Sequence, residues 1–273
     1  MLRLRILTAA VLLPLALAGL FLLSSPGWAL ASGLFIGIGA WEWGRLSGLS
    51  GVARVAYALA LAALAWGLGV AAGVTAPGGG AGLASVFWVA VVFWLLVALP
   101  WLARGWHAVG PAAPLAAGAV VLVPAWLAVV LLQHDPARLL ALMATAWVAD
   151  TGAYFVGRRF GRRKLAPRVS PGKSWEGVAG GVLAVAAYGL LLEWLQPGLV
   201  PGGSPATRLL FLQALLVLGI VGDLFESWMK REAGLKDSGS LLPGHGGVLD
   251  RIDSLTSTLP AAALMAGLAA RSL

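Results

Sequence analysis

The sequence predicts an all-α, polytopic integral membrane protein with about nine transmembrane helices. Hydrophobic residues make up 60% of the 273 residues and charged residues only 11%, whereas soluble domains average about 25% charged residues. The remaining charge is too small to cover a water-facing surface, and the apolar residues gather in stretches long enough to cross a bilayer. The chain also has no cysteine, which excludes disulfide scaffolds, thiol nucleophiles and Cys-ligated metal centres.

A helix needs roughly 20 mostly apolar residues to cross a bilayer. The stretches that we interpret as spans are 6–23, 27–44, 55–74, 83–103, 112–132, 138–156, 175–195, 208–229 and 254–270. Connectors rich in Ser, Pro and Gly separate them. Arg3 and Arg5 before the first stretch also resemble a secretory signal, with 29–31 as a cleavage site. Cleavage there would leave the second stretch too short to cross, so we expect an uncleaved first helix.

The basic residues predict the orientation of these spans. Nine spans place 16 of the 19 Lys and Arg residues on one side of the membrane: Arg3, Arg5, Arg45, Arg54, Arg104, Arg158, Arg159, Arg162, Arg163, Lys164, Arg168, Lys173, Lys230, Arg231, Lys236 and Arg251. The positive-inside rule then puts the N-terminus in the cytoplasm and the C-terminus outside. The net charge of +8 is explained by this placement, and we expect no nucleic-acid partner.

The two halves of the chain differ in chemistry. Residues 1–135 are mainly Ala, Leu, Val, Gly and Trp, and we interpret them as a scaffold with lipid and dimer contacts. Glu42 is the one notable charged residue in this half, and we interpret it as part of the scaffold and its lipid contacts. Residues 136–273 contain the acids that gather at the inner ends of helices. Acidic groups at membrane depth are expensive and predict a functional site, so we expect the catalytic region here.

The spacing of these acids indicates a common site. Asp223, Glu226, Ser227 and Lys230 follow at i, i+3, i+4 and i+7 and therefore share one helical face. Further along lie the glycine-rich loop 238–247 and then Asp250 and Asp253, which we place in the last inner loop. Carboxylate pairs beside Lys, Arg and such a loop are typical of a site for Mg²⁺ and a polyphosphate.

A second segment contains Asp150 in the sixth span, a basic loop, and 170–177 with Lys173, Ser174 and Glu176. Gly172-Lys173-Ser174 ends like a Walker A motif, but Pro167 stands where that motif needs glycine, so we reject a P-loop. The basic loop meeting the inner start of the seventh span remains a candidate anion site. Most of its arginines we interpret as orientation determinants.

At these residues the sequence resembles the phosphatidate cytidylyltransferase (CDP-diglyceride synthetase) family. The resemblance rests on 227–231, Lys236 and Asp237, 242–247 and 250–253, with 150–161 and 170–177 as a second region; together they cover about 147–256. The resemblance implies that CTP and phosphatidic acid react to give CDP-diacylglycerol and pyrophosphate, with Mg²⁺ as cofactor and a second cation left open. It also implies a homodimer in the inner membrane with its site open to the cytoplasm, and it makes Asp223 and Asp250 the metal ligands.

With the resemblance, the expected catalytic residues are Asp223, Lys230, His245, Asp250 and Arg251. The expected substrate-binding residues are Asp150, Lys173, Ser174, Glu176, Glu226, Ser227, Arg231, Lys236, Asp237, Gly246, Gly247 and Asp253. Whether His245 binds phosphate or moves a proton stays open. A CTP-dependent polyprenol kinase, a transferase acting on CDP-lipids and a transporter are the alternatives. The kinase lacks this full run of motifs, and the charges lie at one membrane face, unlike those of most transporters.

Overall fold

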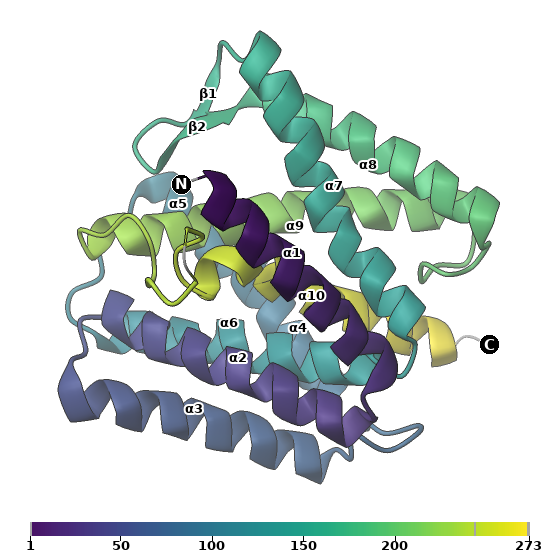
Figure 1. Ribbon diagram of the computed structural model, residues 1–273, viewed down its shortest axis with the longest axis horizontal. Helices are drawn as coiled ribbons and strands as arrows, with labels where there is room; N and C mark the ends of the chain where they lie inside the picture. Colours follow the sequence, from purple (N-terminus) through teal and green to yellow (C-terminus); the bar gives the residue numbers. More distant parts are fainter. Residues whose placement is uncertain (1, 243, 272–273) are drawn as a thin grey trace.

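The computed structural model describes residues 2–242 and 244–271, so Pro243 of the glycine-rich loop lies outside the described residues. The elements are α1 Leu2–Leu22, α2 Ser25–Leu46, α3 Gly51–Ala71, α4 Leu83–Phe93, a π-helical turn η1 Trp94–Ala98, α5 Leu99–Arg104, α6 Ala112–Leu132, α7 Pro136–Phe160, β1 Lys164–Ala166, β2 Ser170–Ser174, α8 Trp175–Leu195, α9 Pro205–Glu232 and α10 Leu249–Arg271. The helical fold class predicted from the sequence is confirmed (Figure 1).

The chain is a multi-pass membrane protein. Over the described residues, seven helical segments are long and apolar enough to cross a membrane. Each predicted span falls on a helix, with α4, η1 and α5 forming one rod, but α1 and α2 are not among the seven. The count of nine and the orientation of the termini therefore stay predictions. Large apolar side chains such as Leu183, Leu190 and Trp194 of α8 are exposed, as lipid-facing residues are.

The core is built around α6 and α10. Most of α6 is buried, and α10 packs against α9, α6 and α4. Phe225 of α9 lies at the centre of an aromatic cluster, with Trp43, Phe93, Trp94 and Trp101 around its ring. The two halves of the chain therefore share one core, and α9 and α10 are held by helices from the first half.

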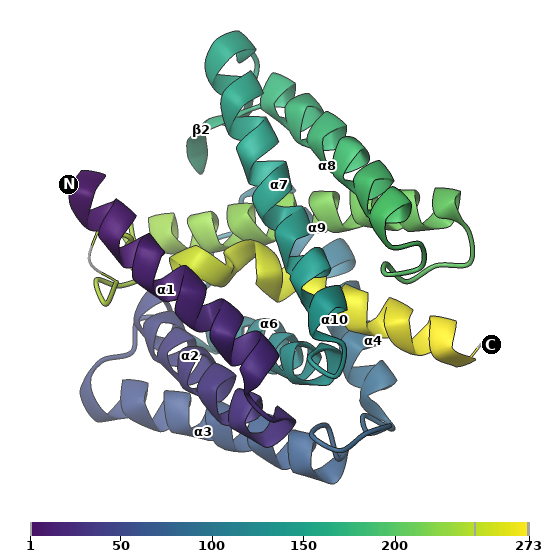
Figure 2. The same cartoon turned by 45° about the vertical axis from the view of Figure 1, so that its right-hand side comes forward.

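Helices α7 and α8 form an arm that crosses the other helices obliquely (Figures 1 and 2). They meet at glycines: a Cβ on Gly180 would lie 2.7 Å from the carbonyl oxygen of Gly152, and a Cβ on Gly152 would lie 2.8 Å from the carbonyl oxygen of Gly180. Small residues at such crossings let membrane helices approach to backbone contact.

The basic segment between α7 and α8 is not wholly a loop. Its residues form an antiparallel β1–β2 hairpin, whereas the sequence analysis predicted an irregular connection. Ser174 ends β2 and caps α8, because its Oγ accepts a hydrogen bond from Gly177 N at 3.1 Å. In Figure 1 the hairpin and the segment between α9 and α10 lie at the same end of the helices. The C-terminal end of α10 lies at the opposite end.

The start of the last helix also differs from the prediction. Helix α10 begins at Leu249 and not near residue 254, so Asp250 and Asp253 stand on its first turns and not in a loop. The apolar run that begins at residue 254 marks only the fully apolar part of the helix. The first turn is polar because it contributes to the cluster described below.

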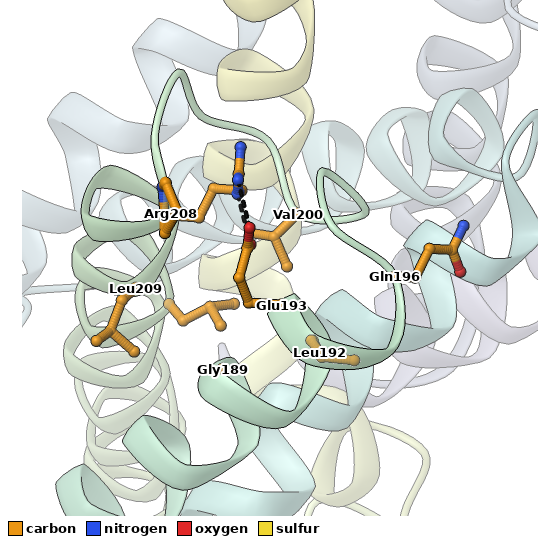
Figure 3. A pocket seen from close by; sticks show the side chains of 9 residues that line it. Gly189, Leu192, Glu193, Gln196, Val200, Arg208 and Leu209 are labelled. Carbon is orange, nitrogen blue, oxygen red and sulfur yellow. Dashed lines mark hydrogen bonds and ion pairs between the residues drawn. The ribbon is translucent and has the colours of Figure 1, made fainter.

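The far ends of α8 and α9 are joined by an ion pair (Figure 3). Arg208 Nη2 lies 2.6 Å from Glu193 Oε1, and Arg208 Nε donates to Glu193 Oε2 at 2.8 Å. Arg208 also donates to the Gly202 carbonyl in the connecting segment. The hollow beside this pair measures only about 10 Å³, so the pair is a structural link between two helices.

Candidate functional site

The site begins with a polar stripe on the C-terminal half of α9. As predicted from the spacing, Asp223, Glu226, Ser227 and Lys230 share one side of the helix. Ser227 Oγ donates to Asp223 Oδ1 at 3.3 Å, and Lys230 Nζ lies 3.2 Å from Glu226 Oε1. Glu226 and Lys230 are buried. A stripe of this kind places two carboxylates and an ammonium against the neighbouring elements.

Two lysines, Lys173 of β2 and Lys230 of the stripe itself, link α9 to neighbouring elements. Lys173 of β2 reaches α9, with Nζ 2.5 Å from Asp223 Oδ2. Lys230 donates to Asp250 Oδ1 of α10 at 2.6 Å. The hairpin, α9 and α10 are therefore joined by two short ion pairs between residues predicted to act together.

Asp250 is the most heavily hydrogen-bonded acid of the cluster. Its Oδ2 accepts hydrogen bonds from the backbone N–H groups of Ser238 and Gly247, at 3.0 and 2.8 Å. Together with Lys230 on Oδ1, these donors fix both oxygens of the carboxylate. Asp250 therefore has a single well-determined orientation at the start of α10.

Two further acids complete the cluster. Asp253 lies within electrostatic range of Asp223, Lys173 and Lys230. Asp150 of α7 is within range of Asp223 and Lys173. The cluster formed by Asp150, Lys173, Asp223, Glu226, Ser227, Lys230, Asp250 and Asp253 thus joins four elements, and we call it the carboxylate–lysine cluster.

The glycine-rich loop is arranged differently from the expectation. The loop 238–247 was expected to contribute to a polyphosphate site, but the amide of Gly247 at its end donates to Asp250, and those of Val248 and Leu249 just after it donate to Glu42. Gly246 has φ +84°, and a Cβ there would lie 2.7 Å from Asp250 Oδ2. Glycine is needed here because the loop turns tightly around that carboxylate.

The sequence did not indicate that Glu42 and Ser238 belong to this arrangement. Glu42 of α2 is fully buried and accepts a hydrogen bond from Ser238 Oγ at 2.9 Å. The interpretation of Glu42 as scaffold and lipid contact is therefore wrong in its second part, because no face of the side chain reaches lipid. A lone acid in an apolar helix was the only signal available, and it does not reveal partners two hundred residues away.

Three predicted substrate-binding residues make structural contacts instead of opening toward the cluster. Ser174 caps α8. Glu176 accepts hydrogen bonds from the backbone of Arg162 and Arg163, so a protein carboxylate already occupies the predicted anion position at the start of α8. Arg231 Nε donates to the carbonyl of Val169 at 3.3 Å and ties the hairpin to α9.

The remaining predicted residues lie around the loop. His245 Nδ1 is buried without a hydrogen-bond partner. Asp237 lies close to Gly246, within 3.5 Å of the position that a Cβ would take there. Lys236 and Arg251 are exposed. These residues flank the cluster without joining its hydrogen bonds and ion pairs.

A larger hollow lies beside the cluster. It measures about 410 Å³ and is lined by residues that include Arg45, Trp101, Trp228 and Glu232. None of the residues of the carboxylate–lysine cluster lines it. The carboxylate–lysine cluster itself is partly open, since Asp150 is exposed and the side chains of Lys173 and Asp223 are partly exposed.

Comparison with known proteins shows the family of the chain. The model of the cytidylyltransferase family matches residues 3–269. The chain belongs to the cytidylyltransferase family. It is accordingly a membrane-embedded nucleotidyltransferase, and the match covers both the first half and the carboxylate–lysine cluster.

Curated relatives carry a more specific name. The chain is 46% identical to the phosphatidate cytidylyltransferase of Pseudomonas aeruginosa over 266 residues, 95% of each chain. It is 37% identical to that of Haemophilus influenzae over 285 residues, 95% of this chain and 96% of the relative. For the Thermotoga maritima protein of that name, similarity spans 126 residues, 45% of this chain and 47% of the relative, at 45% identity.

Proposed function

We propose that this cytidylyltransferase transfers the cytidylyl group of CTP to phosphatidic acid, giving CDP-diacylglycerol and pyrophosphate. The observation that supports the substrate most directly is the 46% identity, over 95% of the chain, to a relative named phosphatidate cytidylyltransferase. The carboxylate–lysine cluster supports the reaction type, because paired acids and lysines at one end of membrane helices suit a polyphosphate that arrives from water.

In the proposed reaction a phosphate oxygen of the lipid attacks the α-phosphorus of CTP. A new P–O bond forms there, and the bond from the α-phosphorus to the bridging oxygen breaks, so that pyrophosphate leaves with the electron pair. A phosphate monoester is nucleophilic near neutral pH, so the protein needs no strong general base. Its contribution is to position two anions and to reduce their repulsion.

The lysines are suited to that contribution. Lys173 and Lys230 are held by Asp223 and Asp250, and phosphate oxygens can replace those carboxylates as partners of the ammonium groups. Each exchange leaves a lysine on an incoming phosphate and frees an aspartate. We propose that Arg251 and His245 bind phosphate at the edge of the cluster, and that the other predicted substrate-binding residues shape its surroundings.

The freed aspartates fit a divalent cation. Within the described residues there is no group of three His, Asp or Glu side chains that could hold a metal alone, but Mg²⁺ is commonly held by one or two carboxylates plus substrate phosphates. Glu226 is buried beside Lys230, with its Oε1 3.2 Å from Lys230 Nζ. We propose that Asp223 and Asp250 would hold Mg²⁺, which when bound neutralises charge on the transferring phosphate.

The cytoplasmic placement of the site belongs to the same proposal. The distribution of basic residues supports an inner-membrane protein with its cluster facing the cytoplasm, where CTP is available. A homodimer is likewise proposed, with contacts in the first half of the chain.

A double-label experiment tests the reaction. The purified protein is incubated with phosphatidic acid and CTP labelled at either the α- or the γ-phosphate. We expect the α-label in the lipid product and the γ-label in pyrophosphate. The γ-label in the lipid would instead show a CTP-dependent kinase. Absence of label from the lipid with both labelled forms of CTP would overturn the proposal. The Asp250→Asn variant and reactions without phosphatidic acid are the controls.

A further inference from the structure

Glu42 is a buried acid whose hydrogen bonds all come from one distant segment. It lies near the inner end of α2 and is 0% exposed. Its Oε1 accepts from Val248 N at 3.1 Å, and its Oε2 accepts from Leu249 N at 2.9 Å and from Ser238 Oγ at 2.9 Å. A carboxylate from the first half of the chain thus holds both ends of the segment 238–249.

The two backbone donors belong to the start of α10, where the first N–H groups of a helix lack partners within it. A side-chain oxygen just before a helix usually accepts such hydrogen bonds. Here an acid from another helix does so, and its negative charge also suits the positive end of the helix dipole. Glu42 therefore fixes where α10 begins, one residue before Asp250.

Ser238 connects Glu42 to the carboxylate–lysine cluster. Its Oγ lies 2.9 Å from Glu42 Oε2 and 3.0 Å from Asp250 Oδ2. The hydroxyl has one proton, so it donates to one of these two acids at a time. The two carboxylates therefore hold the same turn from opposite sides. Glycine at 247 makes room for this, because a Cβ there would lie 2.5 Å from both Glu42 oxygens.

We propose that Glu42 is a positioning residue for the transfer reaction. By holding the segment 238–249 it keeps Asp250 opposite Lys230, and so sets the place where substrate phosphates exchange into the cluster. The expected effect on turnover rests on the proposed function. The claim that Glu42 holds the segment 238–249 does not depend on it. Glu42 itself touches no substrate in this account.

Glu42→Gln tests the proposal with almost no change in size. The amide replaces one acceptor oxygen by an NH₂ group, which then faces a backbone N–H or hydroxyl donor. We expect kcat to fall by about 100-fold, the size of effect that a 1 Å misplacement of reacting groups produces, with the KM for phosphatidic acid unchanged. The control of the same chemistry is Glu232→Gln, since Glu232 also makes a side-chain contact, with His107, but lies at the end of α9 and outside the segment 238–249. We expect it to keep wild-type kcat.

A readout independent of activity follows the segment itself. Because the chain has no cysteine, Val248→Cys introduces a single thiol at a buried position. Its rate of maleimide labelling reports how often the segment opens. We expect labelling about tenfold faster when Glu42→Gln is added, as loss of a helix cap would give. Val169→Cys, at a buried position in the turn of the hairpin, is expected to label at an unchanged rate.

The outcomes separate positioning from general support of the fold. Wild-type kcat in Glu42→Gln would overturn the proposal, and so would a parallel rise in labelling at positions 248 and 169.

If Glu42→Gln does not fold, Ser238→Ala decides, because it removes the shared hydroxyl and keeps both backbone hydrogen bonds to Glu42. We expect lower kcat and faster labelling at position 248; wild-type values would overturn the proposal. If the wild-type protein makes no CDP-diacylglycerol, the proposed function fails, while the labelling still tests whether Glu42 holds the segment.

Discussion

Lys173 Nζ lies 2.5 Å from Asp223 Oδ2, so that the hairpin following α7 is joined to the first residue of the polar stripe on α9. The pair is partly exposed, with side-chain exposures of 25% for Lys173 and 23% for Asp223. Arg231 joins the same two elements through the Val169 carbonyl. The basic hairpin is therefore held against the carboxylate–lysine cluster, and its Lys173 points into that cluster.

This relationship predicts that cations of the cluster and cations of the exposed segment differ in their effect on catalysis. Lys173→Ala, Lys230→Ala or Arg251→Ala is expected to lower kcat/KM by about two decades or more, since contacts to a transferring phosphate stabilise the transition state. Arg159→Ala, Arg162→Ala and Arg163→Ala are expected to lower it by less than about tenfold and to increase its dependence on anionic lipid. Kinetics in one lipid mixture make the comparison. Equal losses in both groups would contradict the division.

The acids opposite those lysines give a second prediction. Asp223→Asn and Asp250→Asn are each expected to reduce turnover nearly to background at saturating Mg²⁺, because an amide cannot replace the charge of a cation ligand. Expression and the thermal unfolding midpoint in detergent are measured in parallel. Normal turnover in either variant would remove that residue from the proposed ligands.

The orientation gives a third prediction. Residues 157–174 and 231–253 are expected to face the cytoplasm, as the bias of basic residues requires. Single cysteines at positions 162 and 240 are both exposed sites in a chain without cysteine. A membrane-impermeant maleimide is expected to label them in inverted vesicles and not in sealed cells. Labelling from the outside would reverse the topology.

A fourth prediction concerns the opposite end of α8 and α9. Glu193→Gln is expected to lower the unfolding midpoint by a few degrees, because it weakens the pair of hydrogen bonds with Arg208 that joins α8 to α9. The kcat is expected to be unchanged, since the pair joins helices far from the cluster. A large loss of kcat at an unchanged unfolding midpoint would show that this end of the arm also serves catalysis.

Local patterns predicted a large part of this molecule. The stripe on α9 follows from helical spacing alone, and the structure confirms that Glu226 and Lys230 lie together. The hairpin was missed because 164–174 has no alternation of apolar and polar residues, only Pro and Gly that indicate turns. Its strands are short and are held by contacts to α8 and α9, which no local window contains.

The contribution of Glu42 could not be predicted for a related reason. Its hydrogen-bond partners are Ser238, Val248 and Leu249, which are distant in sequence and adjacent only after α2 packs beside α10. Likewise, nothing in the glycine-rich loop indicated that its amides would face protein carboxylates. The spacing of residues along the sequence shows which side chains share one face of a helix. It does not show which other helix or loop packs against that face.

The glycine contact between α7 and α8 determines a dimension of the site. Asp150 stands on α7, and Lys173 lies just before α8 begins. Because Gly152 and Gly180 bring the two backbones together, main-chain thickness, and not a side-chain rotamer, sets the separation between the elements that bear these two charges. If the proposed exchange of phosphate for carboxylate takes place, the distance between Asp150 and the hairpin is therefore set by the backbone contact of the arm and is expected to stay constant during the exchange.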